Sequence, residues 1–122
     1  MAELNFTPEQ RAAIDTRGST VLVSAAAGSG KTRVLTERLM TYLTDAENPV
    51  DIDRFLVITY TRAAAAELRS RILDGIYARI ASDPENRRLR RQAALCARAE
   101  IGTIHSFCAD FLRANCAALA LA

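Results

Sequence analysis

The sequence predicts an α/β fold with a parallel sheet flanked by helices. Short apolar runs alternate along the chain with segments of helical periodicity, and strands joined through helices form parallel sheets. The length of 122 residues corresponds to one domain, and a composition of 50% hydrophobic and 25% charged residues is typical of a packed core. We therefore expect a single folded unit rather than a disordered chain.

The first expected elements are a helix, a strand and a second helix. Thr7, the proline after it and Gln10 form a capping-box pattern, so a short helix should follow and end near Asp15. Residues 20–24 are apolar and β-branched, which predicts a buried parallel strand. A helix with apolar residues at a spacing of 3.6 should begin near Lys31.

The rest of the chain repeats the alternation. An alanine-rich segment carries one stripe of leucine and isoleucine, and a short apolar run at residues 55–59 precedes it. The tetrapeptide at residues 82–85 should end this segment and cap the next helix. The elements expected here are strands at residues 55–59 and 100–103 and helices at 63–80, 86–98 and from about 106 onward.

The overall net charge of +2 is too small to predict nucleic-acid binding. The local charge is higher, because residues 62–98 contain nine arginines and four acidic residues, which gives +5. A basic helical face can contact phosphates, but it can equally be a solvated surface.

Three cysteines without a CxxC pair argue against a disulfide framework or a zinc site. They are expected to be small apolar residues in a reducing compartment. The N-terminus has no basic region followed by an apolar run, and no apolar stretch reaches membrane-spanning length. A cytoplasmic protein without membrane contact is therefore expected.

Residues 25–32 have the sequence A-A-A-G-S-G-K-T and match the P-loop pattern, except that alanine stands at its first glycine. Glycines allow backbone conformations that let successive N–H groups surround phosphate oxygens, at the positive end of the next helix. Lys31 supplies a charge for the β and γ phosphates and Thr32 a hydroxyl for Mg²⁺, so these two are the expected catalytic residues. The expected nucleotide-binding residues are Ala25, Ala26, Ala27, Gly28, Ser29, Gly30, Lys31 and Thr32.

The alternative interpretation of this segment is a glycine-containing turn that binds nothing. The apolar run before it and the amphipathic helix after it favour the nucleotide site. A P-loop predicts ATP or GTP with Mg²⁺ but not the function, because kinases, GTPases and motors share it.

Three other segments, at residues 55–72, 102–108 and 6–10, resemble motifs of the UvrD/Rep-like superfamily 1 DNA helicases. Residues 55–72, FLVITYTRAAAAELRSRI, are similar to the family's T-F-T-N-x-A-A-x-E-M-x-x-R-I motif. Residues 102–108, GTIHSFC, are similar to T-x-H-S-F, and residues 6–10, FTPEQ, resemble the family's adenine-recognition motif. Within the superfamily, the segments S-A-A-A-G-S-G-K-T, A-A-A-A-E and I-H-S-F-C look like those of AddA-type helicase/nuclease proteins.

The resemblance implies a RecA-like P-loop NTPase fold and an ATP-dependent motor on single-stranded DNA that acts in double-strand break repair. It also implies a nuclease domain far along the polypeptide, together with an AddB-like partner protein. Residues 1–122 would be the N-terminal part of the helicase ATP-binding domain, motor domain 1.

The resemblance also assigns roles to single residues. Gln10 would bind adenine, although the capping box alone could explain it. Tyr60 would stack on a base, the alternative being a core tyrosine. Arg62 replaces the family's asparagine, and its charge could bind phosphate. The residues expected to contact DNA are Tyr60, Thr61, Arg62, Thr103, His105 and Ser106.

His105 is the only histidine, and a lone histidine is more often structural than catalytic. Phe107, two residues further on, is expected in the core. A departure from the family is Gly102, where the motif usually has serine.

The parts of an ATPase that hold Mg²⁺ through an acidic pair, or stabilise the transferred phosphate through an arginine finger, are not identifiable in this sequence. We therefore expect a fragment that is inactive alone and belongs to an active ATP hydrolase. The alternatives are a UvrD-type repair helicase without nuclease, and a self-contained P-loop nucleotide-binding protein such as a switch or small kinase.

Overall fold

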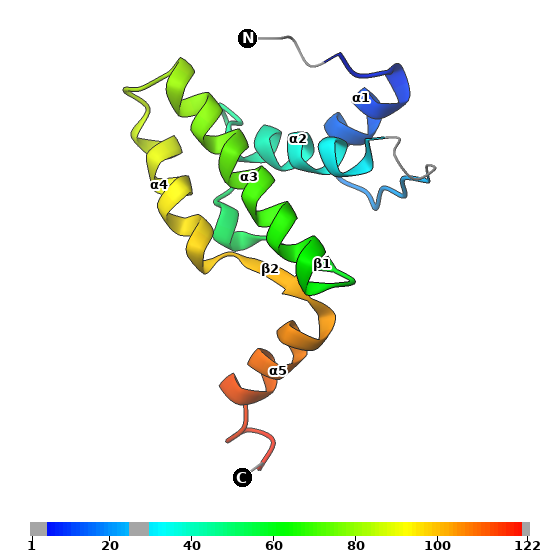
Figure 1. The fold of residues 1–122 in the computed structure, drawn as a ribbon, viewed down its shortest axis with the longest axis vertical. Helices are drawn as coiled ribbons and strands as arrows, with labels where there is room; N and C mark the ends of the chain where they lie inside the picture. The colour runs from blue at the N-terminus through cyan, green and yellow to red at the C-terminus, as the bar shows by residue number, and fades with distance from the viewer. Residues whose placement is uncertain (1–4, 25–29, 121–122) are drawn as a thin grey trace.

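A computed structural model describes residues 5–24 and 30–120. Helices dominate this part of the chain, and a pair of short strands lies at its centre (Figure 1). The elements in chain order are α1 (Pro8–Asp15), α2 (Lys31–Leu43), the 3₁₀-helix η1 (Ile52–Arg54), β1 (Leu56–Thr59), α3 (Arg62–Ser82), α4 (Arg87–Leu95), the 3₁₀-helix η2 (Cys96–Arg98), β2 (Glu100–Thr103) and α5 (Ile104–Ala114).

The two strands are parallel, which confirms the predicted α/β class with a crossover between strands. Their register pairs Leu56 with Glu100 and Thr59 with Thr103. Both strands therefore end at the same edge of the sheet, as expected for parallel pairing. Helix α3 packs against both strands and against α2 and α4, so it is the central element of the fold.

The strand predicted at residues 20–24 is wrong, because this segment has no regular secondary structure. The side chain of Leu22 is 92% exposed. A strand requires hydrogen bonds to a neighbouring strand, and β1 and β2 pair only with each other in the described part of the chain. Apolar, β-branched composition alone does not produce a strand without such a partner.

The apolar run at residues 55–59 predicts a buried strand, but β1 is buried on one face only. Val57 is buried, whereas Leu56 and Ile58 are 50% and 44% exposed. The face with Val57 points toward α3, and nothing in the described residues covers the other face to the same extent.

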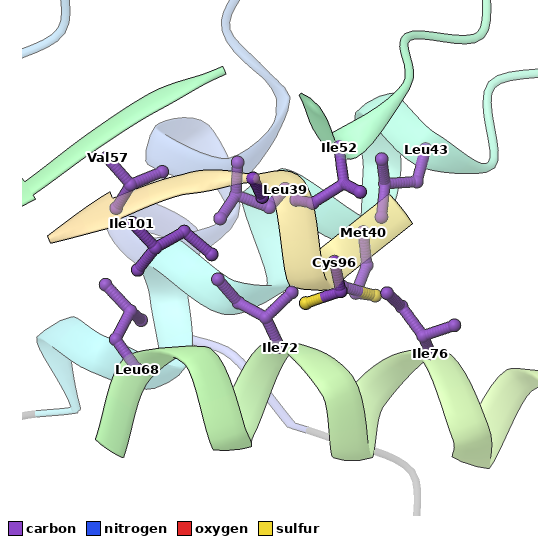
Figure 2. Close-up of a cluster of buried hydrophobic side chains, with 11 residues drawn as sticks. Leu39, Met40, Leu43, Ile52, Val57, Leu68, Ile72, Ile76, Cys96 and Ile101 are labelled. Carbon is purple, nitrogen blue, oxygen red and sulfur yellow. The ribbon is translucent and has the colours of Figure 1, made fainter. Parts of the chain in front are cut away.

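The core lies between α3, α2 and the strands (Figure 2). Leu68, Ile72 and Ile76 form the predicted apolar stripe of α3 and point toward Met40 and the strand residues. Helix α2 approaches α3 closely at Gly75, where an added Cβ would lie 3.3 Å from the Met40 sulfur. A small residue at this crossing therefore lets the two helices pack tightly.

Polar caps set the helix boundaries. The predicted capping box of α1 is confirmed, with the Thr7 N–H donating to Gln10 Oε1 at 2.9 Å and the Gln10 N–H donating to Thr7 Oγ1 at 3.2 Å. The cap expected for α4 at residues 82–85 is wrong. These residues form a turn instead, in which the Asn86 N–H donates to the Asp83 carbonyl. Asn86 then caps α4 by accepting the Leu89 N–H at 3.2 Å.

Helices α3 and α5 begin earlier than predicted because threonines cap them. Thr61 and Thr103 are N-caps, so α3 starts at Arg62 and α5 at Ile104, each directly after a strand end. Helix α4 ends at Leu95 because the chain tightens into the 3₁₀ turn η2.

A buried polar network attaches α4 to the segment before β1. Gln92 is fully buried, and its Oε1 accepts the Ile52 N–H at 2.7 Å while its Nε2 donates to Asp51 Oδ1 at 2.8 Å. Arg88 donates to the same carboxylate oxygen at 2.6 Å. These hydrogen bonds, from Arg88 first and then Gln92, lower the pKa of the Asp51 carboxyl below its usual range.

Replacing Asp51 with asparagine should flatten the acid limb of the stability profile. A carboxyl whose pKa is lowered by folding stabilises the fold above its unfolded pKa, and this contribution is lost as the pH falls through the folded pKa. The loss therefore lies below about pH 4. Urea unfolding between about pH 2.5 and 7 measures it, with the exposed Asp53→Asn as the matched control. Identical pH dependence of Asp51→Asn and the wild type would contradict the role of this network.

Candidate nucleotide-binding and nucleic-acid-binding sites

Three of the predicted P-loop residues lie in the described part of the chain, namely Gly30, Lys31 and Thr32. Gly30 has φ of 87° and is the N-cap of α2. A left-handed backbone at this point disfavours any residue with a Cβ. The predicted residues Ala25, Ala26, Ala27, Gly28 and Ser29 lie outside the described residues.

The start of α2 differs from the starts of the other α-helices. Among the described α-helices, only α2 lacks a side-chain cap, whereas α1, α3, α4 and α5 are capped by threonine or asparagine. The first N–H groups of a helix have no intrahelical acceptor, and the helix dipole makes this end positive. The uncapped end of α2, with the exposed Lys31, thus fits a phosphate group.

The same end fits a phosphate-bound Mg²⁺. Thr32 is exposed in the first turn of α2, and its hydroxyl is the kind of hard oxygen ligand that Mg²⁺ prefers. The described residues contain no group of three histidine, cysteine, aspartate or glutamate side chains that could hold a metal ion. Besides Thr32, this part of the chain offers few metal ligands. The nucleotide would therefore supply most of the ligands of a metal bound at Thr32.

Gln10 lies beside the P-loop. Its Nε2 is 3.6 Å from the position that a Cβ on Gly30 would occupy, since α1 packs on α2. The capping box uses Gln10 Oε1 as an acceptor, but a carbonyl oxygen has two lone pairs. The structural role and the predicted nucleotide contact are therefore compatible in the same side chain.

Two arginine side chains pack against Phe6 in the segment before α1. The guanidinium carbon of Arg11 lies 5.1 Å from the Phe6 ring centroid and that of Arg33 lies 4.6 Å from it. Arg33 also donates to the Asn5 carbonyl at 3.3 Å, which ties this segment to the first turn of α2. Arg33 was not among the residues predicted from the sequence, although its place directly after the P-loop threonine was a signal for it.

The second site is a cleft of about 640 Å³ at the edge where both strands end. It is lined by all six residues that were predicted to contact DNA, together with three further residues of α5. The structure thus brings together two motifs that are some 40 residues apart in the chain. The residues that line the cleft are Tyr60, Thr61, Arg62, Thr103, His105, Ser106, Ala109, Asp110 and Arg113.

Two helix N-termini meet in this cleft. Thr61 caps α3 by accepting the Ala64 N–H at 3.0 Å, and Thr103 caps α5 by accepting the Ser106 N–H at 3.1 Å. Because Thr59 and Thr103 pair across the strands, both helices begin at the same edge of the sheet. Their positive ends favour anionic groups in the cleft.

The hydroxyl groups of the two capping threonines differ in exposure and in their hydrogen bonds. Thr103 is 7% exposed, and its hydroxyl donates to Ser106 Oγ at 3.0 Å as well as accepting the Ser106 N–H. Thr103 therefore positions Ser106 and the start of α5. Thr61 is exposed, so its hydroxyl proton remains accessible from the cleft.

Tyr60 is 99% exposed, so the interpretation of this residue as a core tyrosine is wrong. Its ring stands at the cleft, directly before the first turn of α3. Arg62 is exposed as the first residue of α3, and His105 is exposed as the second residue of α5. The cleft therefore offers one aromatic surface and two side chains that suit phosphate.

Helix α5 contributes residues that sequence reasoning missed. Arg113 and Asp110 form an exposed ion pair of 3.1 Å on the cleft side of α5. They follow Ser106 at spacings of seven and four residues, and this helical spacing was the signal that could have found them. The prediction that Phe107 lies in the core is wrong, because none of the residues of α5 is buried and Phe107 instead packs beside Phe111.

A groove with a larger volume than this cleft is lined by none of the residues that were predicted to form a site. It has a volume of about 1090 Å³ and lies between α2, α3 and the segment before α1. Glu37 and Arg79 are joined across it by an ion pair of 2.9 Å, which links α2 to α3. Because none of the predicted site residues lines this groove, we place the functional sites by their chemistry and not by size.

Cys96 is buried, and burial raises the pKa of its thiol, whereas Cys108 and Cys116 are exposed. Of the three cysteines, only Cys96 therefore packs in the core. Over residues 5–24 and 30–120, no helix is both long and apolar enough to cross a membrane.

Known proteins are similar to this chain over nearly its whole length. Residues 6–121 match the family described as the UvrD/REP helicase N-terminal domain. A protein from Thermoanaerobacter sp. (strain X514), whose name describes an ATP-dependent helicase/nuclease subunit, is 56% identical over 110 residues, which are 90% of this chain. Proteins of the same name from Clostridium acetobutylicum and Clostridium perfringens (strain 13) are 51% identical over 115 residues (94% of this chain) and 53% identical over 110 residues (90% of this chain).

These relatives are much longer proteins, since the matched region is 9% of the length of each. The match to the family nevertheless includes the residues of both candidate sites. The chain belongs to the UvrD/REP helicase N-terminal domain family.

Proposed function

We propose that residues 1–122 are the N-terminal part of the ATP-binding domain of a DNA helicase, motor domain 1, with a RecA-like P-loop fold. In the intact protein this part would couple ATP hydrolysis to movement along single-stranded DNA. The observation that carries the proposal is the cleft in which all six predicted DNA contacts meet. The uncapped start of α2 supports the nucleotide half of the proposal.

The nucleotide would bind at the start of α2. The uncapped N–H groups and Lys31 would hold the phosphates, and Gln10 would contact the adenine ring from beside Gly30. Bound Mg²⁺, with Thr32 as a ligand, would neutralise charge on the β and γ phosphate oxygens. Positive charge at this end of α2 would orient the phosphates, and orientation is most of what phosphoryl transfer requires of a protein.

Single-stranded DNA would bind in the cleft. The starts of α3 and α5, with Arg62, His105 and Ser106, would contact backbone phosphates. The exposed ring of Tyr60 would stack on a base, a contact that is independent of sequence because every base has a π-face. Such binding suits a motor that must move along any sequence.

Helix α3 would connect the two sites. Its first residue, Arg62, lies at the cleft, and its middle packs on α2 where Gly75 meets Met40. A displacement of α2 on nucleotide binding would therefore press on the helix whose start contacts DNA. Packed elements of this kind transmit shifts because cores are dense and resist deformation.

The names of the relatives favour a helicase/nuclease of the AddA type over a UvrD-type repair helicase without nuclease. Because these names describe one component of a larger assembly, they support a complex, for which an AddB-like protein is the partner we propose. We place this complex in the cytoplasm and assign it to double-strand break repair.

Replacing Tyr60 with alanine in the intact protein should weaken the binding of single-stranded DNA by about 1–3 kcal/mol, whatever the sequence of the oligonucleotide. Fluorescence anisotropy with labelled oligo-dT and a mixed-sequence oligonucleotide, at one fixed salt concentration, measures this loss. Tyr77→Ala is the matched control, because Tyr77 is a half-exposed tyrosine of α3 that does not line the cleft. Equal dissociation constants for Tyr60→Ala and the wild type would rule out the stacking role.

A further inference from the structure

Four arginines form a stripe along the outer side of α4 and η2, which we name the α4 arginine stripe. The exposed positions of this segment include 87, 90, 91, 94, 97 and 98, a spacing that describes one face of a helix. The opposite face, with Leu89, Gln92 and Cys96, is buried against the core. The members of the stripe are Arg87, Arg90, Arg91 and Arg98.

The charge of the stripe is largely uncompensated. Residues 86–99 contain five arginines, Arg88 among them, and no acidic residue. Because the whole chain has a net charge of only +2, the remainder of the chain is net acidic. Arg88 turns inward to Asp51 at 2.6 Å, and Arg91 approaches the same carboxylate only at 3.6 Å while its side chain stays 65% exposed. The closest acidic residues along the chain, Glu85 and Glu100, flank the segment at its two ends.

The stripe is separate from the DNA cleft. None of its arginines lines the cleft, and Arg98 precedes the first residue of β2 whereas Thr103 ends that strand at the cleft. The four residues of β2 separate these points by about 13 Å. Figure 1 shows α4 along the outer side of α3, at the end of β2 that is remote from α5.

The chemistry of the stripe selects a phosphate backbone as its ligand. Guanidinium groups bind phosphate oxygens in a bidentate manner, and the stripe extends for about 17 Å along α4 and η2. That length corresponds to about five phosphate steps along one strand of a duplex, at about 3.4 Å of axis per step. The face carries arginine and alanine and no aromatic ring on which unpaired bases could stack.

From this we propose that the α4 arginine stripe binds the phosphate backbone of double-stranded DNA, outside the cleft that takes the single strand. The inference rests on the proposed DNA-motor function and adds a duplex contact to it. The convex face of a helix fits a duplex groove or backbone ridge. Sites for single-stranded DNA stack its bases on aromatic side chains, and this stripe has none. Binding would be independent of sequence and strongly dependent on salt.

The test replaces Arg87, Arg91 and Arg98 together with glutamine in the intact protein. Affinities for a blunt duplex of about 20 base pairs and for oligo-dT are measured by anisotropy between about 50 and 200 mM salt. The slope of log K against log salt for the duplex should become shallower by about 2–3, because each lost phosphate contact accounts for about 0.9. Duplex affinity at about 50 mM salt should fall by about tenfold or more, with oligo-dT affinity unchanged.

Two controls isolate the stripe. The triple lysine variant at the same three positions keeps the charge and should keep most of the slope. Arg71→Gln removes one exposed arginine of α3 that is paired with Glu67 and lies outside the stripe, and it should leave the duplex slope unchanged. The melting temperature of the glutamine variant should match the wild type, since Arg88 still holds Asp51.

An unchanged duplex slope in the glutamine variant would overturn the inference, and so would an equal loss of duplex and oligo-dT affinity. Weaker association with a partner protein, at full duplex affinity, would also overturn it and assign the stripe to an acidic protein surface. If the duplex slope falls but the intact protein fails to bind oligo-dT, the proposed motor function fails and the stripe assignment stands.

Discussion

Replacing Lys31 with alanine should reduce the kcat of DNA-stimulated ATP hydrolysis by the intact protein by about 10²–10³-fold, the usual cost of losing one preorganised contact to developing charge. Lys31 is the first residue of α2, a helix whose start is capped by no side chain of the described residues. The alanine variant would retain the helix dipole but lose the mobile cation that follows the γ phosphate. ATP affinity should fall as well, because a charge-assisted phosphate contact is lost.

A phosphate-release assay with saturating single-stranded DNA measures turnover, and isothermal titration measures ATP affinity. Arg71→Ala is the control for loss of one positive charge, because Arg71 lies in an exposed pair with Glu67 on α3. Single-strand affinity without ATP should be the same in both variants. Turnover of Lys31→Ala within about threefold of the wild type would mean that the nucleotide is held elsewhere.

Local signals allowed the helices to be predicted from the sequence. The capping box at Thr7 and Gln10 and the apolar stripe from Leu68 to Ile76 are short-range patterns, and the structure reproduces both. Strand β2 was predicted at its observed bounds, residues 100–103, between two predicted helices. The strand at residues 20–24 failed because a strand depends on a partner that local sequence does not specify.

For the sites, too, some features follow from the sequence and others depend on three-dimensional packing. The meeting of Tyr60 and His105 in one cleft followed from a general rule, since parallel strands end at the same edge and ligands bind there. Whether Tyr60 was exposed, and whether the Thr103 hydroxyl was already engaged, depended on three-dimensional packing. The uncapped start of α2 became informative only by contrast with the four capped helices around it.

The position of β2 depends on one side chain of α3. Arg69 donates to the carbonyl of Cys96 at 2.5 Å and to the carbonyls of Ala99 and Ile101 at 3.1 Å each. These three acceptors cover the end of η2 and the beginning of β2, around 30 residues away along the chain. Arg69 therefore fixes the strand that delivers Thr103 to the cleft.

Replacing Arg69 with methionine should lower the free energy of unfolding by about 2–4 kcal/mol, because the apolar stem is kept while a charged donor to three partly buried carbonyls is lost. Arg71→Met is the matched control on the same helix. Its exposed pair with Glu67 is worth about 0.5 kcal/mol or less. Urea unfolding of both variants at neutral pH measures the difference. Equal stabilities would show that the backbone hydrogen bonds of η2 and β2 hold this strand without Arg69, and that the cleft does not depend on it.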